Sequence, residues 1–304
     1  MGARSGGTAD ERGENVERRP PPWMRGDVVR VRGYRSVGVQ NPRVTLPSAA
    51  VTLLVGWGEP LHIRQGLGGT RRAETRQAMI AGLQTAPVLA GFRGSGLAVE
   101  IEFTAVGASR VLGLPLHLLT NTAAHPDEAM GPGWTARLTE RLAQAPDWDA
   151  RWAVVDDALA PRLAAAPSAP GLAVEAWQRL REAHGGLTAR ELAAATGRGE
   201  RRLQRVFRDH VGVPPQTVSR ILRFQRALAL SGRAAHLSLT EVAAMSGYHD
   251  QAHMNRDFRA LAGRTPGELR LVADRLTAGA GTGGAAAREP GCLSDFFEAG
   301  AADW

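Results

Sequence analysis

Two short clusters of Arg, Gln and Asn offer the most specific chemistry in this 304-residue sequence. A guanidinium can make two parallel hydrogen bonds to the O6 and N7 of guanine, and a Gln or Asn amide can do the same for adenine. A small residue beside them fits a thymine methyl group. In each cluster, helical spacing places the polar residues on one face. The first face comprises Arg201, Gln204, Arg205 and Arg208, and the second comprises Gln251, Ala252, Asn255, Arg256 and Arg259. These residue types suit surfaces that read base edges in a DNA groove.

A solvated helix face is the competing interpretation of each cluster. The chain contains no Lys, so all 37 basic residues are Arg and an Arg stripe partly reflects composition. Phosphate contact is a further alternative for any single Arg, because many protein–DNA hydrogen bonds go to the backbone. The residue types alone therefore leave three roles open for each Arg.

A duplicated pattern around the clusters favours the DNA interpretation. At an offset of 50, five residues of the first copy recur in the second, namely Leu187, Glu191, Ala193, Ala194 and Gly197 as Leu237, Glu241, Ala243, Ala244 and Gly247. At an offset of 51, five more recur, namely Arg205, Phe207, Arg208, Gly212 and Pro215 as Arg256, Phe258, Arg259, Gly263 and Pro266. Agreement at ten positions indicates one structural plan used twice.

Each copy begins with a helix start signal. Thr188 with Glu191, and Ser238 with Glu241, have the spacing of a capping box, in which hydroxyl and carboxylate each bind a backbone N–H left free at the helix start. The Gly at the end of each short helix tolerates the left-handed conformation that closes it. A second amphipathic helix follows each Gly, with the polar cluster on its free face. A capped helix, a turn and a polar second helix are typical of a DNA-binding helix-turn-helix motif.

Residues 173–275 resemble the DNA-binding domain of AraC/XylS-type transcriptional regulators, and GYHDQAHMNRDFRALAGRTPGELR is similar to that family's signature. The resemblance implies a seven-helix unit in which one long helix joins two motifs. By position it implies base-facing residues at Arg201, Gln204 and Arg205 in the first motif and at Gln251, Ala252, His253, Asn255 and Arg256 in the second. Two departures are Gly199, where a capping Ser is common, and Met254, where the family usually has Phe or Leu. Gly is an acceptable cap and Met conserves volume.

The chain as a whole is predicted to be an α+β protein of two domains. Residues 1–22 are charged and contain no apolar run typical of a signal peptide, so we expect a disordered arm. Short β-like segments separated by Gly and Pro predict a barrel or sandwich, at residues 28–31, 51–57, 61–64, 88–92 and 97–106. Two amphipathic helices follow, from Trp134 and from Trp148, with Asp147 as a cap for the second. The predicted divisions are a β-rich domain at 23–165, a linker at 166–172, the helical domain at 173–276 and a flexible tail at 277–304.

The β-rich domain resembles the sensor-side domain ahead of AraC-type motifs in some actinobacterial regulators, on the segments GLQTAPV near 82 and EFTAVGASRVLGLPLHLL from 102. The resemblance implies either an unknown small-molecule effector or a homodimer contact, and both stay open. The AraC-type resemblance also implies a cytoplasmic regulator that activates transcription through contact with RNA polymerase, although nothing in the residues excludes repression. A helix over 215–232 would span about 25 Å, which would set the two motifs near the ~34 Å of one DNA turn.

An enzyme with its active site in the β-rich domain is the rival hypothesis. His62, His117 and His125 lack the short spacing of metal ligands, so we predict no metal site and no cofactor. Glu100 and Glu102 share one face of a predicted strand, which suits a solvated edge better than an acid/base pair. Cys292 has no neighbouring base or second thiol and is expected to be a free thiol.

Charge favours double-stranded DNA as the partner. Residues 171–275 contain 17 Arg against 10 Asp and Glu, a net charge of +7, and this equals the excess of the whole chain. Phosphate neutralisation requires positive charge on the DNA-binding domain. The Arg stripes lie opposite a core rather than opposite a strip of Trp, Phe and Leu, which argues against a membrane surface.

Overall fold

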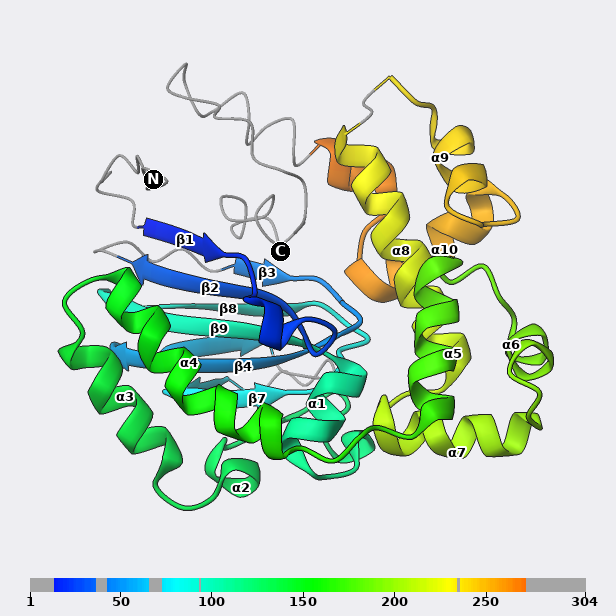
Figure 1. Cartoon of the computed structure of the whole chain (residues 1–304). Coiled ribbons are helices and arrows are strands. Elements are labelled where there is room, and N and C mark those ends of the chain that lie inside the picture. The colour runs from blue at the N-terminus through cyan, green and yellow to red at the C-terminus, as the bar shows by residue number, and fades with distance from the viewer. Residues whose placement is uncertain (1–13, 37–42, 66–72, 93, 234–235, 272–304) are drawn as a thin grey trace, which may run out of the picture.

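The computed structural model describes residues 14–36, 43–65, 73–92, 94–233 and 236–271. An N-terminal β-rich domain with helices on one face precedes a C-terminal helical domain (Figure 1). The predicted α+β class, a barrel- or sandwich-like domain followed by a double helix-turn-helix domain, is confirmed. The start of the predicted arm, the predicted tail and Cys292 lie outside the described residues.

Antiparallel strands form two sheets in the described part of the β-rich domain. The larger sheet has the order β1-β2-β9-β4-β7-β10 and the smaller one β3-β8-β5-β6. The strand bounds are β1 Glu14–Arg18, β2 Val28–Ser36, β3 Arg43–Thr45, β4 Ala50–Gly58, β5 Leu61–Gln65, β6 Glu74–Arg76, β7 Ala78–Ala81, β8 Val88–Phe92, β9 Gly96–Thr104 and β10 Ala123–Ala124.

Two predictions about this domain are wrong in part. Residues 14–18 pair with β2 as strand β1 and therefore do not belong to a disordered arm. The predicted strand over 97–106 ends at Thr104, because the Thr104 hydroxyl accepts a hydrogen bond from Gly107 N at 2.9 Å and starts helix α1, Ala105–Leu112.

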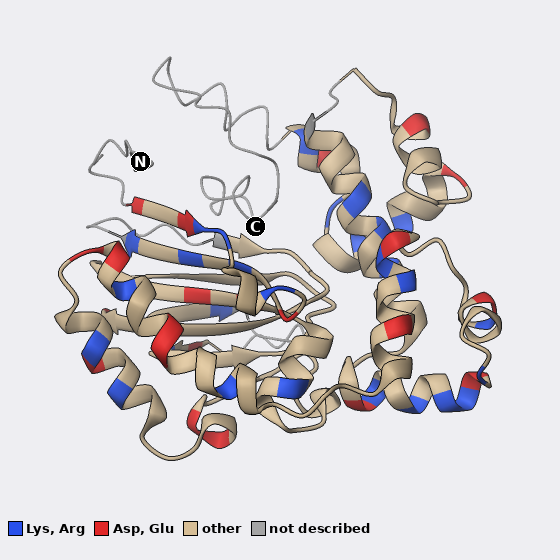
Figure 2. Cartoon of the chain, viewed as in Figure 1, with Lys and Arg blue, Asp and Glu red and all other residues tan. Residues whose placement is uncertain are grey.

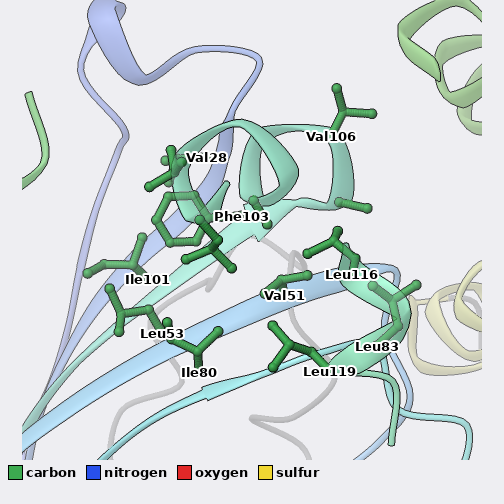
Figure 3. Close-up of a cluster of buried hydrophobic side chains, with 14 of the residues drawn as sticks. Val28, Val51, Leu53, Ile80, Leu83, Ile101, Phe103, Val106, Leu116 and Leu119 are labelled. Carbon is green, nitrogen blue, oxygen red and sulfur yellow. The ribbon is translucent and has the colours of Figure 1, made fainter. Parts of the chain in front are cut away.

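Successive side chains of a strand point to opposite faces of the larger sheet. One of these faces packs against helices and the other packs against the smaller sheet. Val99, Ile101 and Phe103 of β9 belong to the main core cluster. Figure 3 shows Ile101 and Phe103 beside Val51 of β4. Helices α3, Trp134–Gln144, and α4, Trp148–Ala165, lie over this face (Figure 1). Ala98 and other residues of opposite phase face the smaller sheet and form a separate cluster with it.

Short elements connect the sheets to the helices. A 3-10 turn, η1, spans Pro22–Met24, another, η3, spans Leu116–Leu118, and α2 spans Asp127–Met130. As predicted, Asp147 caps α4, its carboxylate accepting from Ala150 N at 2.8 Å. Residues 166–170 contain no helix or strand.

Helices alone form the described C-terminal domain. Their bounds are α5 Gly171–Glu182, α6 Ala189–Ala195, α7 Glu200–His210, α8 Pro215–Arg233, α9 Leu239–Met245 and α10 Gln251–Ala262, and residues 266–271 are also helical. The long α8 separates the pair α6/α7 from the pair α9/α10 (Figure 1).

Candidate nucleic-acid interface

Both predicted capping boxes are present at the starts of α6 and α9. Glu191 N donates to the Thr188 hydroxyl at 3.2 Å, and Thr188 N donates to the Glu191 carboxylate at 2.8 Å. Ser238 and Glu241 make the same two bonds at the same lengths. Hydrogen bonds from the backbone and hydroxyl of Thr188 lower the pKa of Glu191, and those from the hydroxyl and backbone of Ser238 lower the pKa of Glu241.

The turns between the helices are closed by glycine, as predicted. Gly197 has φ +61° and Gly247 has φ +79°, a region that residues with a side chain rarely adopt. The second helix of each motif then begins differently. Gly199 offers α7 no side-chain cap, whereas the Asp250 carboxylate caps α10 by accepting from His253 N at 2.6 Å. This backbone hydrogen bond is the largest influence that lowers the pKa of Asp250.

Helix α7 presents its predicted polar cluster outward. Leu203 and Phe207 are fully buried and fix one side of the helix in the core. The four cluster residues are all exposed: Arg201, Gln204, Arg205 and Arg208. The structure therefore places four hydrogen-bonding side chains on one open surface, and their roles toward bases remain predictions.

Helix α10 presents a more mixed surface. Met254 and Phe258 are fully buried. Three predicted residues are exposed and three are half-buried: Ala252, Arg256 and Arg259 in the first group, and Gln251, His253 and Asn255 in the second. The outer face of the second motif is thus only partly open.

Each half-buried side chain on α10 has its own neighbours. The Thr240 hydroxyl donates to Gln251 Oε1 at 3.1 Å, so the first helix of the motif orients this amide. The ring of His253 packs edge-on against Tyr248, with centroids 5.2 Å apart. The Asn255 side-chain oxygen is enclosed and accepts no hydrogen bond from the described residues. Of the three, Asn255 is the least ready to make a paired contact with adenine.

Asp257 is a functional candidate that the sequence patterns did not identify. It lies on the inward side of α10 and is 7% exposed. Its carboxylate is 2.6 Å from Arg220 Nε on α8, 3.9 Å from Arg223 Nη2 and 4.0 Å from His253 Nε2. Asp257 therefore ties the second recognition helix to α8. The sequence indicated this role only by placing an acidic residue among the apolar positions 254, 258 and 261 of the helix.

The two motifs differ in charge. From Thr188 to His210 the first motif carries six exposed Arg and three acidic residues, whereas from Ser238 to Arg270 the second carries four Arg and four acidic residues. Blue segments, which mark Arg, recur along α7 in Figure 2. The first motif therefore carries the larger net positive charge.

A charged cluster between the two sheets corrects one prediction. Glu100 and Glu102 are not a solvated strand edge, because β9 lies between β2 and β4 and both carboxylates bind the Arg32 side chain, which is 4% exposed. Arg32 Nη2 is 2.8 Å from Glu102, and the Tyr34 hydroxyl donates to Glu100 at 3.2 Å. Burial, followed by the charge of Glu100, raises the pKa of Glu102 to about 7.

The three histidines of the β-rich domain are dispersed. His62 is 3.3 Å from the Thr75 hydroxyl, His117 is 3.7 Å from Asp209, and the His125 ring accepts from Asp127 N. Among the described residues, no group of three or more His, Cys, Asp or Glu could hold a metal ion. Within the same ranges, no helix combines the length and apolarity needed to cross a membrane.

Comparison with known proteins identifies the C-terminal region. Residues 192–271 match the family model described as a helix-turn-helix domain. The F1 operon positive regulatory protein of Yersinia pestis is 35% identical over 81 residues, which is 27% of this chain and 27% of that protein. Residues 192–271 are therefore a helix-turn-helix domain. The chain thus spans about a quarter of the length of the curated relative it matches.

Solved structures give only distant likenesses. The match to ToxT from Vibrio cholerae O395 covers 79% of this chain and 96% of the ToxT chain. The sequence identity is 11% and the TM-score is 0.42. The match to the AraC-like transcriptional activator CuxR covers 72% of this chain and 79% of the CuxR chain, at 13% identity and a TM-score of 0.18.

Proposed function

We propose that this protein is a sequence-specific DNA-binding transcriptional regulator that reads two adjacent major-groove segments. The observation that carries the proposal is the duplicated motif, in which capped helices α6 and α9 each support a second helix with polar side chains turned outward. Helix α8 has 19 residues and therefore spans about 28 Å. This length suits two recognition helices about one DNA turn apart, near 34 Å.

The roles of individual residues belong to the same proposal. Arg201, Gln204 and Arg205 would contact bases from α7, and Gln251, Ala252, His253, Asn255 and Arg256 from α10. Arg208 and Arg259 lie one turn further along and suit phosphates. We also propose that the N-terminal domain modulates DNA binding, in response to a small molecule or by pairing with a second copy. Such a regulator acts in the cytoplasm and can recruit or hinder RNA polymerase.

Selection of bound fragments from random DNA, followed by footprinting on the enriched sequence, tests the proposal. We expect two protected patches about 10 base pairs apart for each protomer. A single short patch, or no enrichment over random DNA, would overturn it. A reporter promoter carrying the selected site then distinguishes activation from repression by the direction of the change in transcription.

Thermal shift of the full chain against a metabolite panel tests modulation by the N-terminal domain. A metabolite that raises the melting temperature and changes DNA affinity supports an effector. A panel without such a metabolite, together with a concentration-dependent dimer, favours a domain that only pairs subunits.

A further inference from the structure

The N-terminal domain holds the end of the first recognition helix. Ser109 Oγ on α1 lies 2.7 Å from Nδ1 of His210, which is the last residue of α7. The Thr120 hydroxyl, just after η3, donates to the carbonyl of Gly212 at 2.8 Å. Side chains of α1, η3 and α7 share one buried cluster. The contact therefore combines directional hydrogen bonds with a continuous core.

Gly212 shows how closely the two domains approach. Its φ is +95°, and a Cβ built there would lie 2.9 Å from the carbonyl oxygen of Leu116 and 2.9 Å from the Thr120 hydroxyl. Only a residue without a side chain fits both the backbone conformation and the space. The turn after α7 is thus pressed directly onto η3.

A second, separate contact reaches the second motif. Val44 of β3 and Leu46 just after it are 1% and 7% exposed, and they belong to the cluster built by Phe224 of α8 and Phe258 of α10. Strand β3 lies in the smaller sheet, whereas η3 and α1 follow β9 of the larger one. Figure 1 shows β3 directed toward α8 and α10, and α1 beside α7.

We propose that the N-terminal domain is a clamp that fixes the orientation of the two recognition helices relative to each other, with Thr120 and Leu46 as positioning residues. The inference rests on the proposed reading of two DNA segments. Two helical units joined by one helix can shift against each other unless further contacts restrain them. Here each sheet supplies one restraint, so a change in the packing of the two sheets moves one motif relative to the other. The Arg32 cluster lies between the sheets, where a ligand or a proton can cause such a change.

The test measures affinity of the full chain for the selected DNA site at its natural spacing and with two base pairs inserted between the half-sites. The insertion rotates one half-site by about 70°. Wild type should lose about tenfold or more in affinity. In Thr120→Val and Leu46→Ala the loss should shrink to less than about threefold, because the motifs can then follow the displaced half-site.

Matched controls separate orientation from stability. Thr120→Ser keeps the hydroxyl and should restore the wild-type ratio of the two affinities. Thr139→Val and Leu142→Ala alter α3, remote from both contacts, and should also keep that ratio even where they lower the melting temperature. Partial unfolding reduces binding to both DNAs alike, so it does not change the ratio.

Two outcomes overturn different claims. If Thr120→Val and Leu46→Ala keep the wild-type ratio, the clamp is wrong while the two-segment reading stands. If wild type binds both spacings equally well, or shows no two-part site, the proposed function itself fails.

Discussion

Replacing Asp257 by Asn should loosen the second recognition helix without unfolding its core. Two unit charges about 4 Å apart attract by about 4 kcal/mol at an effective dielectric constant of 20. The Arg220 side chain is 37% exposed and the Arg223 side chain 19% exposed, so solvent screening reduces this value. We expect the variant to lose about 2 kcal/mol of stability, because the arginines lose their buried counter-charge.

The packing around Asp257 decides how that loss affects DNA binding. The rings of Phe224 and Phe258 meet edge-on at 4.7 Å and still hold α10 on α8 in the variant. The helix therefore stays folded but is less firmly oriented. Affinity for the selected site should fall about tenfold, which corresponds to ~1.4 kcal/mol. Affinity for random DNA should not fall, since no phosphate-binding cation is removed.

The assay compares Asp257→Asn with Asp157→Asn on α4. The Asp157 carboxylate is 2.7 Å from Arg141, but the two side chains are 66% and 47% exposed, so the control should change stability by less than about 0.5 kcal/mol. Melting temperature and the ratio of specific to random DNA affinity are measured for both. Equal behaviour of the two variants would refute the anchoring role of Asp257.

The remaining predictions concern the charged cluster, the first recognition helix and one cap. Because the folded-state pKa of Glu102 is about 7 and the unfolded value is about 4.3, this group leaves stability unchanged below pH 4 and reduces it as pH rises toward 7. Glu102→Gln should therefore be the more stable form at pH 8 by at most about 4 kcal/mol, since each pKa unit corresponds to about 1.4 kcal/mol. A difference in melting temperature between Glu102→Gln and wild type that is the same at pH 4 and pH 8 would contradict this. Arg205→Ala should cost about 1–3 kcal/mol on the selected site and relax preference at one base pair; uniform weakening on all DNA would assign the residue to phosphate. Ser238→Ala removes the cap of α9 and should lower the free energy of unfolding by about 1 kcal/mol. Ser238→Thr is the control, because it keeps the hydroxyl. A melting temperature of Ser238→Ala equal to that of wild type would argue against the cap.

The helical domain could be predicted in detail because its signals are local. A capping box lies within four residues, and the closing Gly follows within one short helix. Both features are present at the predicted positions, including Gly197 and Gly247. The role of Asp257 was not predicted because its arginine partners lie on α8, and Arg220 is 37 residues away in the sequence. A pattern of neighbouring residues does not indicate such a distant ion pair.

The β-rich domain was predicted only in outline, since strand order depends on distant pairing. Strand β7, AMIA, was missed because it has a single β-branched residue, and β1, ENVER, because it is charged. The alternation of polar and apolar residues along this strand predicted that Glu100 and Glu102 lie at a solvated edge of the sheet. Their burial follows from the placement of β9 between β2 and β4, which periodicity does not encode.

The contact between the domains also bears on how regulation can work. Recognition helices contact bases mainly through their N-terminal residues. On α7 these residues, including Arg201 and Arg205, are exposed, while the N-terminal domain occupies the opposite end at His210 and Gly212. The attached domain therefore leaves the proposed base-contacting surface of α7 open. Under the proposed function, we expect regulation through this contact to act on the orientation of α7, since the contact leaves the exposed face of that helix uncovered.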